Sequence, residues 1–226
     1  MPQAGGFGHQ ESATVSQAMQ DSIFTIGHST HPQERFIDLL RQYGITALCD
    51  VRSKPYSRMN PQFNREELEQ ALLSHGIAYR FLGKELGARS DDPACYEGGK
   101  VQYSRLAKTE LFIHGLKRVL SGMKQGFRIT LMCAEKEPLE CHRTILVAPC
   151  LVASGVDVEH IHADGRLESH AAALGRLARI LHLPEEDMFH SREELLADAC
   201  RRQEERIAYQ MAGESADGGT VTGTAG

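Results

Sequence analysis

Three short polar clusters have residue types that could do chemistry, and each directly follows an apolar run. They are Gly27-His28-Ser29 after residues 23–26, Asp50-Val51-Arg52 after residues 45–49, and Cys133-Ala134-Glu135 after residues 127–132. If the apolar runs are parallel strands, all three clusters meet at the carboxyl edge of one sheet, which is where open α/β sheets bind ligands. The sequence therefore predicts a functional site at this edge.

His28 and Ser29 stand between a predicted strand and a predicted helix. A histidine there can donate a hydrogen bond to an anion or transfer protons near neutral pH. The alternative is that His28 caps the helix or braces the loop.

Asp50 and Arg52 alternate along a strand end, so both side chains point to the same face. A carboxylate beside a guanidinium stays ionised, which suits a base, a metal ligand or a partner that orients His28. The alternative is a structural ion pair. Lys54 and Arg58 extend the basic pattern, and residues 51–65 contain four cations and no carboxylate. We therefore expect this connection to attract an anion.

The segment 133–143 contains the densest chemistry of the chain, and three hypotheses compete for it. In the first, which we favour, Glu135 faces the crevice while His142 and Arg143 bind an anion at a helix N-terminus. In the second, Cys133, Cys141 and His142 bind zinc, although the cysteine spacing is not the usual one and no fourth ligand is evident. In the third, Cys133 or Cys141 is a reactive thiol.

A second group of polar residues ends the last predicted strand. His160, His162 and Asp164 lie there, and His162 or Asp164 could join the site. Their alternative role is to satisfy loop hydrogen bonds. The chain has neither a Gly-x-Gly-x-x-Gly fingerprint nor a Walker loop, which argues against a dinucleotide or P-loop site. We assign no metal ligand and predict no cofactor, while a divalent metal is left open.

Composition favours one main soluble domain. The 226 residues are 41% hydrophobic and 24% charged, and the formal net charge of -5 argues against nucleic-acid binding through the whole surface. No apolar stretch approaches the roughly 20 residues of a membrane span. The N-terminus lacks a signal-peptide pattern, and the six cysteines form no regular framework, so we expect a reduced, cytoplasmic location and no membrane association.

The order of the predicted elements indicates an α/β fold. Strands are predicted at 23–27, 46–51, 77–82, 127–132 and 156–161, and helices at 32–43, from 64 with a capping box of Asn64 and Glu67, at 104–124 and at 139–154. This alternation predicts a doubly wound, mostly parallel sheet of about five strands with helices on both faces, plus C-terminal helices.

The expected organisation is a disordered segment 1–20, an α/β domain 21–165, a helical extension 166–211 and a disordered tail 212–226. The extension is predicted to contain helices at 167–181 and 184–211, which pack on the domain or form a homodimer surface. The long connection 83–103 is rich in Gly, Asp and Lys and is a candidate lid or binding loop.

The motifs together resemble a known family. Thr25-Ile26-Gly27-His28-Ser29, Asp50-Val51-Arg52-Ser53 with Asn60-Pro61-Gln62-Phe63-Asn64, and the segment from Cys133-Ala134-Glu135 to Cys141-His142-Arg143 resemble the bacterial and archaeal family called domain of unknown function 488. The resemblance covers residues 23–161 and implies the same α/β fold. It implies no reaction.

We expect an intracellular enzyme, a hydrolase or transferase, that acts on an anionic, phosphate-bearing substrate such as a nucleotide or nucleic acid. Arg52, Arg58 and Arg143 would hold the phosphate, assisted by Ser29, Lys54, Cys133 and Cys141. Asp50 or Glu135 would be the base, and His28 or His142 the acid. The alternatives are a non-catalytic module that binds a nucleotide or nucleic acid, and a thiol-dependent enzyme that uses Cys133 or Cys141.

Overall fold

The computed structural model describes residues 22–184 and 188–211. The segments 1–20 and 212–226, for which the sequence predicts disorder, lie outside these residues.

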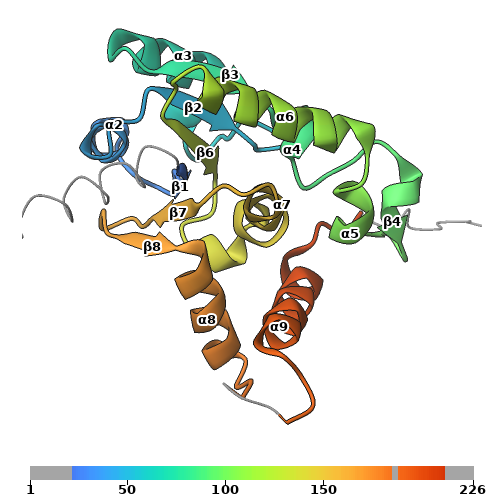
Figure 1. Cartoon of the computed structure of the whole chain (residues 1–226). Helices are drawn as coiled ribbons and strands as arrows, with labels where there is room; N and C mark the ends of the chain where they lie inside the picture. The colour runs from blue at the N-terminus through green and yellow to red at the C-terminus, as the bar shows by residue number, and fades with distance from the viewer. Residues whose placement is uncertain (1–21, 185–187, 212–226) are drawn as a thin grey trace, which may run out of the picture.

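A six-stranded sheet in the order β3-β2-β6-β1-β7-β8 forms the centre of the fold (Figure 1). Its strands are β1 Ile23–Gly27, β2 Ala47–Asp50, β3 Ala78–Phe81, β6 Ile129–Cys133, β7 Val158–Ile161 and β8 Leu167–Ser169. The first five are parallel to one another, and β8 pairs antiparallel with β7. The predicted α/β fold is therefore confirmed, with one strand more than expected.

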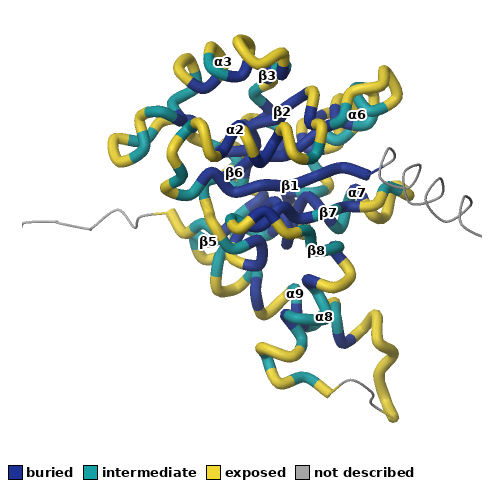
Figure 2. The backbone as a smooth tube through the Cα atoms, turned by 90° about the vertical axis from the view of Figure 1, so that its left-hand side faces the viewer, coloured by how far each residue is buried: buried dark blue, intermediate teal, exposed yellow. Residues whose placement is uncertain are grey.

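Helices cover both faces of this sheet. The longer ones are α2 Gln33–Gln42, α3 Arg65–Ser74, α6 Glu110–Lys124, α8 His170–Ile180 and α9 Arg192–Ile207, and the short ones are α4 Gly83–Leu86, α5 Tyr103–Leu106 and α7 Ala148–Ala153. The apolar residues of α2 and α3 form one core cluster with the sheet, and those of α4 to α8 form a second. Figure 2 shows β1, β6 and β7 as a buried layer between exposed outer surfaces.

The connection 83–103 has more structure than a loop. It contains α4, the 3-10 helix η2 Pro93–Cys95 and a hairpin of β4 Tyr96–Glu97 with β5 Lys100–Val101. Val101 N donates a hydrogen bond to Tyr209 O at 3.0 Å, so this hairpin is joined to the C-terminal end of the described chain. The predicted single helix 104–124 is wrong, because the Thr109 hydroxyl accepts from Phe112 N and starts α6 separately from α5.

The predicted helix 139–154 is also wrong at its start, because the continuous helical stretch begins only after Cys141. The 3-10 helix η3 Pro138–Glu140 is followed by extended Cys141, then by the π-helix η4 Arg143–Val147 and by α7. Pro149 lies in the first turn of α7 and has no N–H to donate, which removes an α-helical bond at the place where the wider π-turn occurs. The extended backbone at Cys141 turns the chain, so that the side chains of Cys141 and His142 lie near Cys133 at the end of β6.

The C-terminal extension differs from its prediction in two places. Residues 167–169 form β8, and Ser169 then caps α8 by accepting from Ala172 N. α9 begins only at Arg192, behind a capping box of Ser191 and Glu194. The two helices pack side by side below the sheet (Figure 1), and Gln203 of α9 donates to Leu139 O at 2.8 Å. Whether this surface also forms a homodimer stays a prediction.

The capping box predicted at Asn64 is wrong. Asn64 does precede α3, but its side-chain oxygen accepts a hydrogen bond from Ser57 N at 2.8 Å. Asn64 therefore closes the basic connection after β2 instead of capping the helix.

Among the described helices, none is both long enough and apolar enough to cross a membrane.

Gly27 is the last residue of β1, and the backbone of Glu135, in the turn after β6, lies directly against it. A Cβ atom at this position would overlap the Glu135 carbonyl group and lie 3.2 Å from Nη2 of Arg143. We expect Gly27→Ala to lower the free energy of unfolding by about 3 kcal/mol, because backbone must move to make room. Urea unfolding measures this loss.

The matched control is Gly175→Ala in α8. A Cβ atom there would meet only Nη2 of Arg192, at an ordinary contact distance of 3.6 Å. Because alanine favours a helix over glycine, this variant should be more stable by up to about 1 kcal/mol. Equal effects of the two substitutions would contradict the close crossing at Gly27.

Candidate functional site

The three polar clusters come together as the sequence predicts. β1, β6 and β2 are neighbours in the sheet, with Gly27 opposite Cys133 and Asp50 opposite Met132. Past the strand ends, His28 N donates to Cys133 O at 2.9 Å. The clusters therefore form one continuous edge.

Strand pleating divides this edge into two sides. Ile26, Leu48 and Met132 pack into the core under α2 and α3, whereas Cys49 and Cys133 pack into the opposite core. The Asp50 carboxylate bonds to a tyrosine of the α2/α3 core, and His28 stacks on a phenylalanine of that core. We call this the His28 side, and the opposite one, where Cys133 lies, the Cys133 side.

The Asp50–Arg52 pair is the most completely bonded feature of the His28 side. Asp50 is fully buried, and its Oδ2 accepts from Arg52 Nη2 at 2.6 Å and from Tyr79 OH at 2.8 Å. Oδ1 accepts from the backbone N of Arg52 at 3.1 Å and from its Nε at 2.9 Å. These contacts favour the structural alternative, in which Asp50 orients Arg52.

Arg52 in turn touches both neighbouring segments. Nη2 also donates to Phe63 O at 2.8 Å, and Nη1 donates to His28 Nε2 at 3.2 Å. A guanidinium has five N–H groups, so these bonds leave one on Nη1 for a ligand. Arg52 can hold an anion only in a single orientation.

His28 is neutral at physiological pH. Its Nδ1–H donates to Ser29 O at 2.8 Å, and its ring stacks on Phe63 with centroids 4.4 Å apart. Burial, followed by the charge of Arg52, lowers the pKa of His28 to about 4. The surroundings therefore favour a bracing role over that of a general acid.

The Cys133 side brings together two thiols and an imidazole. Nδ1 of His142 lies 3.7 Å from the sulfur of Cys133 and 3.7 Å from that of Cys141. Its Nε2 lies 3.1 Å from Val51 O, and because a carbonyl oxygen only accepts, Nε2 carries a hydrogen. Glu135 Oε2 lies 3.0 Å from the Cys141 sulfur.

The charges of this group are coupled. Burial opposes ionisation of Cys141, but a hydrogen bond from Cys133 and the positive charge of Arg143 outweigh it and lower the pKa of Cys141 well below its usual value. The same hydrogen bond, together with burial, raises the pKa of Cys133. The surroundings therefore favour ionisation of Cys141 over ionisation of Cys133.

Glu135 has the surroundings of an acid–base group. Loss of solvent around its carboxyl, followed by the charge of Cys141, raises its pKa, although the residue as a whole is exposed. A carboxyl group whose pKa lies nearer to neutrality can both accept and return a proton.

Arg143 does not reach the crevice, contrary to the expectation that it binds an anion there. It is fully buried, and its Nη1 donates to Glu135 O at 2.8 Å. Within the described residues its Nε and Nη2 have no hydrogen-bond partner. Its charge therefore acts from within the core, where it lowers the pKa of Cys141.

Two adjoining cavities open along the edge. The cavity of the Cys133 side has a volume of about 260 Å³, and its lining includes Lys54, Arg89, Tyr103, Glu135, Cys141 and Tyr209. The cavity of the His28 side has a volume of about 300 Å³ and is lined by His28, Ser29, Thr30, Arg52, Lys54, Tyr56, Ser57, Asn60 and Ala134. Arg52, Lys54 and Ala134 line both.

Several lining residues were not predicted. Tyr103, Ile207 and Tyr209 come from α5 and from the C-terminal extension, far from the three motifs in sequence. Arg89 belongs to the connection that was predicted to be a lid or binding loop, and its guanidinium lies 4.0 Å from the ring centroid of Tyr209. Of the predicted cations, Arg58 is exposed and lines neither of the two cavities.

The candidates at the end of β7 have other partners. His160 lies 2.7 Å from Thr25 Oγ1, and burial lowers its pKa to about 3. His162 lies 2.8 Å from a carboxylate oxygen of Glu168, and exposed Asp164 pairs with Arg166. The contacts of His162 and Asp164 agree with the alternative of loop hydrogen bonds, whereas His160 bonds to a threonine of the neighbouring strand β1.

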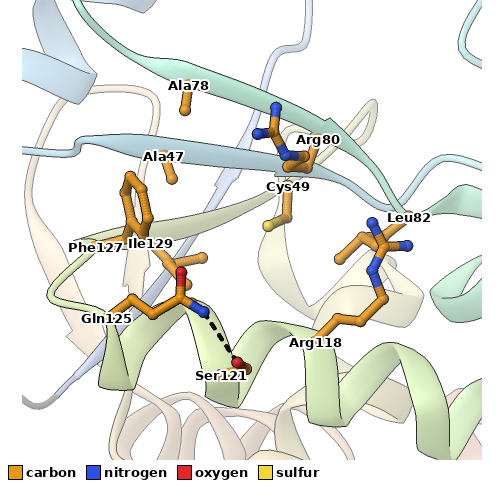
Figure 3. Close-up of a pocket in the computed structure, with 11 residues that line it drawn as sticks. Ala47, Cys49, Ala78, Arg80, Leu82, Arg118, Ser121, Gln125, Phe127 and Ile129 are labelled. Atoms are coloured by element: carbon orange, nitrogen blue, oxygen red, sulfur yellow. Dashed lines mark hydrogen bonds between the residues drawn. The ribbon is translucent and has the colours of Figure 1, made fainter.

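Another cavity, of about 300 Å³, lies between α6 and the sheet (Figure 3). Arg80 and Arg118 line it among mainly apolar side chains, and the Arg118 guanidinium pairs with Glu85. Cys49 is its only thiol among the described residues, and burial raises the pKa of Cys49 to about 12. This cavity therefore lacks the reactive groups of the strand edge.

Comparison with known proteins gives one match. The sequence pattern of a family described as "Domain of unknown function DUF488" matches residues 32–149. The matched residues include the clusters at 50–52 and 133–135, whereas His28 and Ser29 precede the matched residues. No curated protein and no solved structure matched the chain.

The bonding of Asp50 leads to a stability prediction. Asp50→Asn should lower the free energy of unfolding by about 3–5 kcal/mol, because it leaves the buried charge of Arg52 without its counterion. Tyr79→Phe removes one hydrogen bond to the same carboxylate and should cost only about 1 kcal/mol. Urea unfolding of both variants tests this, and a stable Asp50→Asn protein would contradict the anchoring role.

Neutral His28 leads to a pH prediction. At pH 5 the unfolded chain binds a proton at His28, with a pKa near 6.5, while the folded chain, with a pKa of about 4, does not. Stability contributed by this group is therefore lost as the pH falls below 6.5, by about 2 kcal/mol between pH 7 and pH 5.

His28→Gln should remove that part of the pH dependence. Denaturant unfolding at pH 7 and pH 5 measures the difference between wild type and variant. Ring-nitrogen NMR provides a direct check, since a titration midpoint near pH 6.5 for His28 would overturn the prediction.

Proposed function

We propose that this chain, which belongs to the family described as Domain of unknown function DUF488, is an enzyme that acts on an anionic, phosphate-bearing substrate at the carboxyl edge of its sheet. The substrate class that we propose is a nucleotide or a nucleic acid. The observation that carries the proposal is the pair of adjoining cavities, one with donors for an anion and one with groups for proton transfer.

The cavity of the His28 side suits a phosphate group. Among the described residues that line it, none is acidic, while Arg52 and Lys54 are cationic and Ser29, Thr30 and Ser57 offer hydroxyl groups. Arg52 contributes its remaining Nη1 N–H, and the exposed ammonium of Lys54 adds a mobile positive charge. This arrangement supports anion binding although the whole chain is acidic.

The cavity of the Cys133 side suits the reacting group. Glu135 is the acid–base residue that we propose, because its carboxyl group lines this cavity and its pKa is raised. Arg52, Lys54 and Ala134 are common to both cavities, so one substrate can place its phosphate on one side and its reacting bond on the other. The alternative is a non-catalytic module that binds the same ligand.

A product assay with matched variants tests the proposal. The full chain, with and without a divalent metal, is incubated with mononucleotides and short DNA and RNA, and the products are identified by mass spectrometry. Glu135→Gln should lower turnover about 10²- to 10⁴-fold while substrate still binds. A product that is formed equally by Glu135→Gln would contradict the role of Glu135, and binding without any product would favour the non-catalytic module.

Lys54 provides a separate binding test. Lys54→Ala should weaken substrate affinity about fivefold, with less effect at high salt, because this ammonium is exposed and screened. The control is Lys117→Ala. Lys117 is an exposed lysine of α6, and it lines neither of the two strand-edge cavities nor the cavity between α6 and the sheet. Equal affinities of the two variants would argue against phosphate binding at the strand edge.

A further inference from the structure

Cys133, Cys141 and His142 have the arrangement of a metal site. Their two sulfur atoms and one imidazole nitrogen all lie within 4.8 Å of one another. Tetrahedral zinc, with bonds of about 2.3 Å to sulfur and about 2.0 Å to nitrogen, places sulfur and nitrogen ligands about 3.6 Å apart. Both sulfur–Nδ1 distances here are 3.7 Å. The two sulfur–nitrogen distances are therefore already suited to one ion.

The orientation of His142 supports the same conclusion independently. Its Nε2–H donates to Val51 O at 3.1 Å, which turns Nδ1 toward the two sulfurs. Histidine ligands of metals characteristically donate their other ring N–H to a carbonyl or carboxylate, which fixes the ring and the tautomer. His142 is also buried, so its ring is held by packing as well as by this bond.

The local fold explains how an unusual spacing produces this group. Cys133 ends β6, while Cys141 and His142 follow the 3-10 helix η3, which brings the chain back to the strand end. The gap between the cysteines exceeds that of the common short zinc motifs because η3 lies within it.

We propose that Cys133, Cys141 and His142 bind one thiophilic divalent cation, Zn²⁺ in the first instance, through Sγ, Sγ and Nδ1. Thiolate and imidazole ligands select Zn²⁺ over Mg²⁺ or Ca²⁺, which prefer oxygen. Two thiolates neutralise the ion. The fourth position would face the cavity of the Cys133 side, which all three residues line together with Glu135.

An ion with three protein ligands and an open position is typical of catalytic rather than structural zinc. When bound, it would supply a Lewis acid beside the cavity. Glu135 lies against Cys141 and does not belong to the group of three converging ligands. The proposed function and this metal site share a cavity. Metal content and cobalt spectra are measured without any turnover, so either proposal can fail without the other.

The experiment uses the full chain, reduced and freed of any affinity tag. Metal content is measured after dialysis against Zn²⁺, and the zinc-free chain is titrated with Co²⁺. We expect one ion per chain and, with Co²⁺, the sulfur-to-cobalt charge-transfer band and the intense visible bands of tetrahedral thiolate coordination. Wild-type protein that takes up no ion, or that shows an octahedral cobalt spectrum without charge transfer, overturns the proposal.

Variants then identify the ligands. Cys133→Ser, Cys141→Ser and His142→Ala should each lower Zn²⁺ affinity more than about 100-fold, which exceeds the effect of losing an outer contact. Cys150→Ser, which changes a half-buried cysteine of α7 outside the group, should bind like wild type. Circular dichroism checks that each variant folds. Folded ligand variants that keep wild-type affinity would overturn the assignment.

Two further measurements separate this proposal from its competitors. Glu135→Gln should retain one ion even though we expect it to be inactive, so loss of turnover there leaves the metal site standing. Intact mass under non-reducing conditions tests for a bond between Cys133 and Cys141. A mass lower by two hydrogens, localised to these cysteines and accompanied by no metal uptake after reduction, would overturn the metal site in favour of thiol–disulfide chemistry.

Discussion

The buried ion pair of Asp50 and Arg52 is the constraint on which the site depends. Removing both charges from water is costly, and the structure offsets this with four hydrogen bonds to one carboxylate. Because the bonds come from the strand end itself and from Tyr79 of β3, they hold the chain past β2 in one conformation. Arg52 then holds His28 and the Phe63 carbonyl, so the first and second clusters behave as one rigid unit.

Strand pleating explains why one sheet edge carries two different chemistries. Side chains two residues apart share a face, so residues 26, 48, 50 and 52 lead to the His28 side while residues 131, 133 and 135 lead to the Cys133 side. The main chain joins the two sides. Val51 supplies the carbonyl that fixes His142, although its neighbours Asp50 and Arg52 belong to the other side. A change in register at β2 would therefore disturb both cavities.

The buried charges near the Cys133 side balance one another over short distances. Arg143 has no carboxylate partner among the described residues, and its positive charge favours the thiolate of Cys141. This thiolate in turn raises the pKa of the neighbouring His142 against the effect of burial. Burying such a group destabilises the fold, because buried charges without full pairing lose their hydration.

The sequence by itself determined the elements whose signals are local. Apolar runs predicted five parallel strands, and the polar residues that follow three of them predicted where the site lies. It also brought Cys133, Cys141 and His142 together as one hypothesis. Only the tertiary structure decided that the Asp50 carboxylate is saturated with hydrogen bonds, because Tyr79 donates to it from another strand. Burial of Arg143, the break before α7 and the lining contributed by Tyr209 likewise depend on residues distant in sequence. Periodicity reports which face of an element is apolar, whereas hydrogen-bond saturation and cavity shape arise only when separate elements pack together.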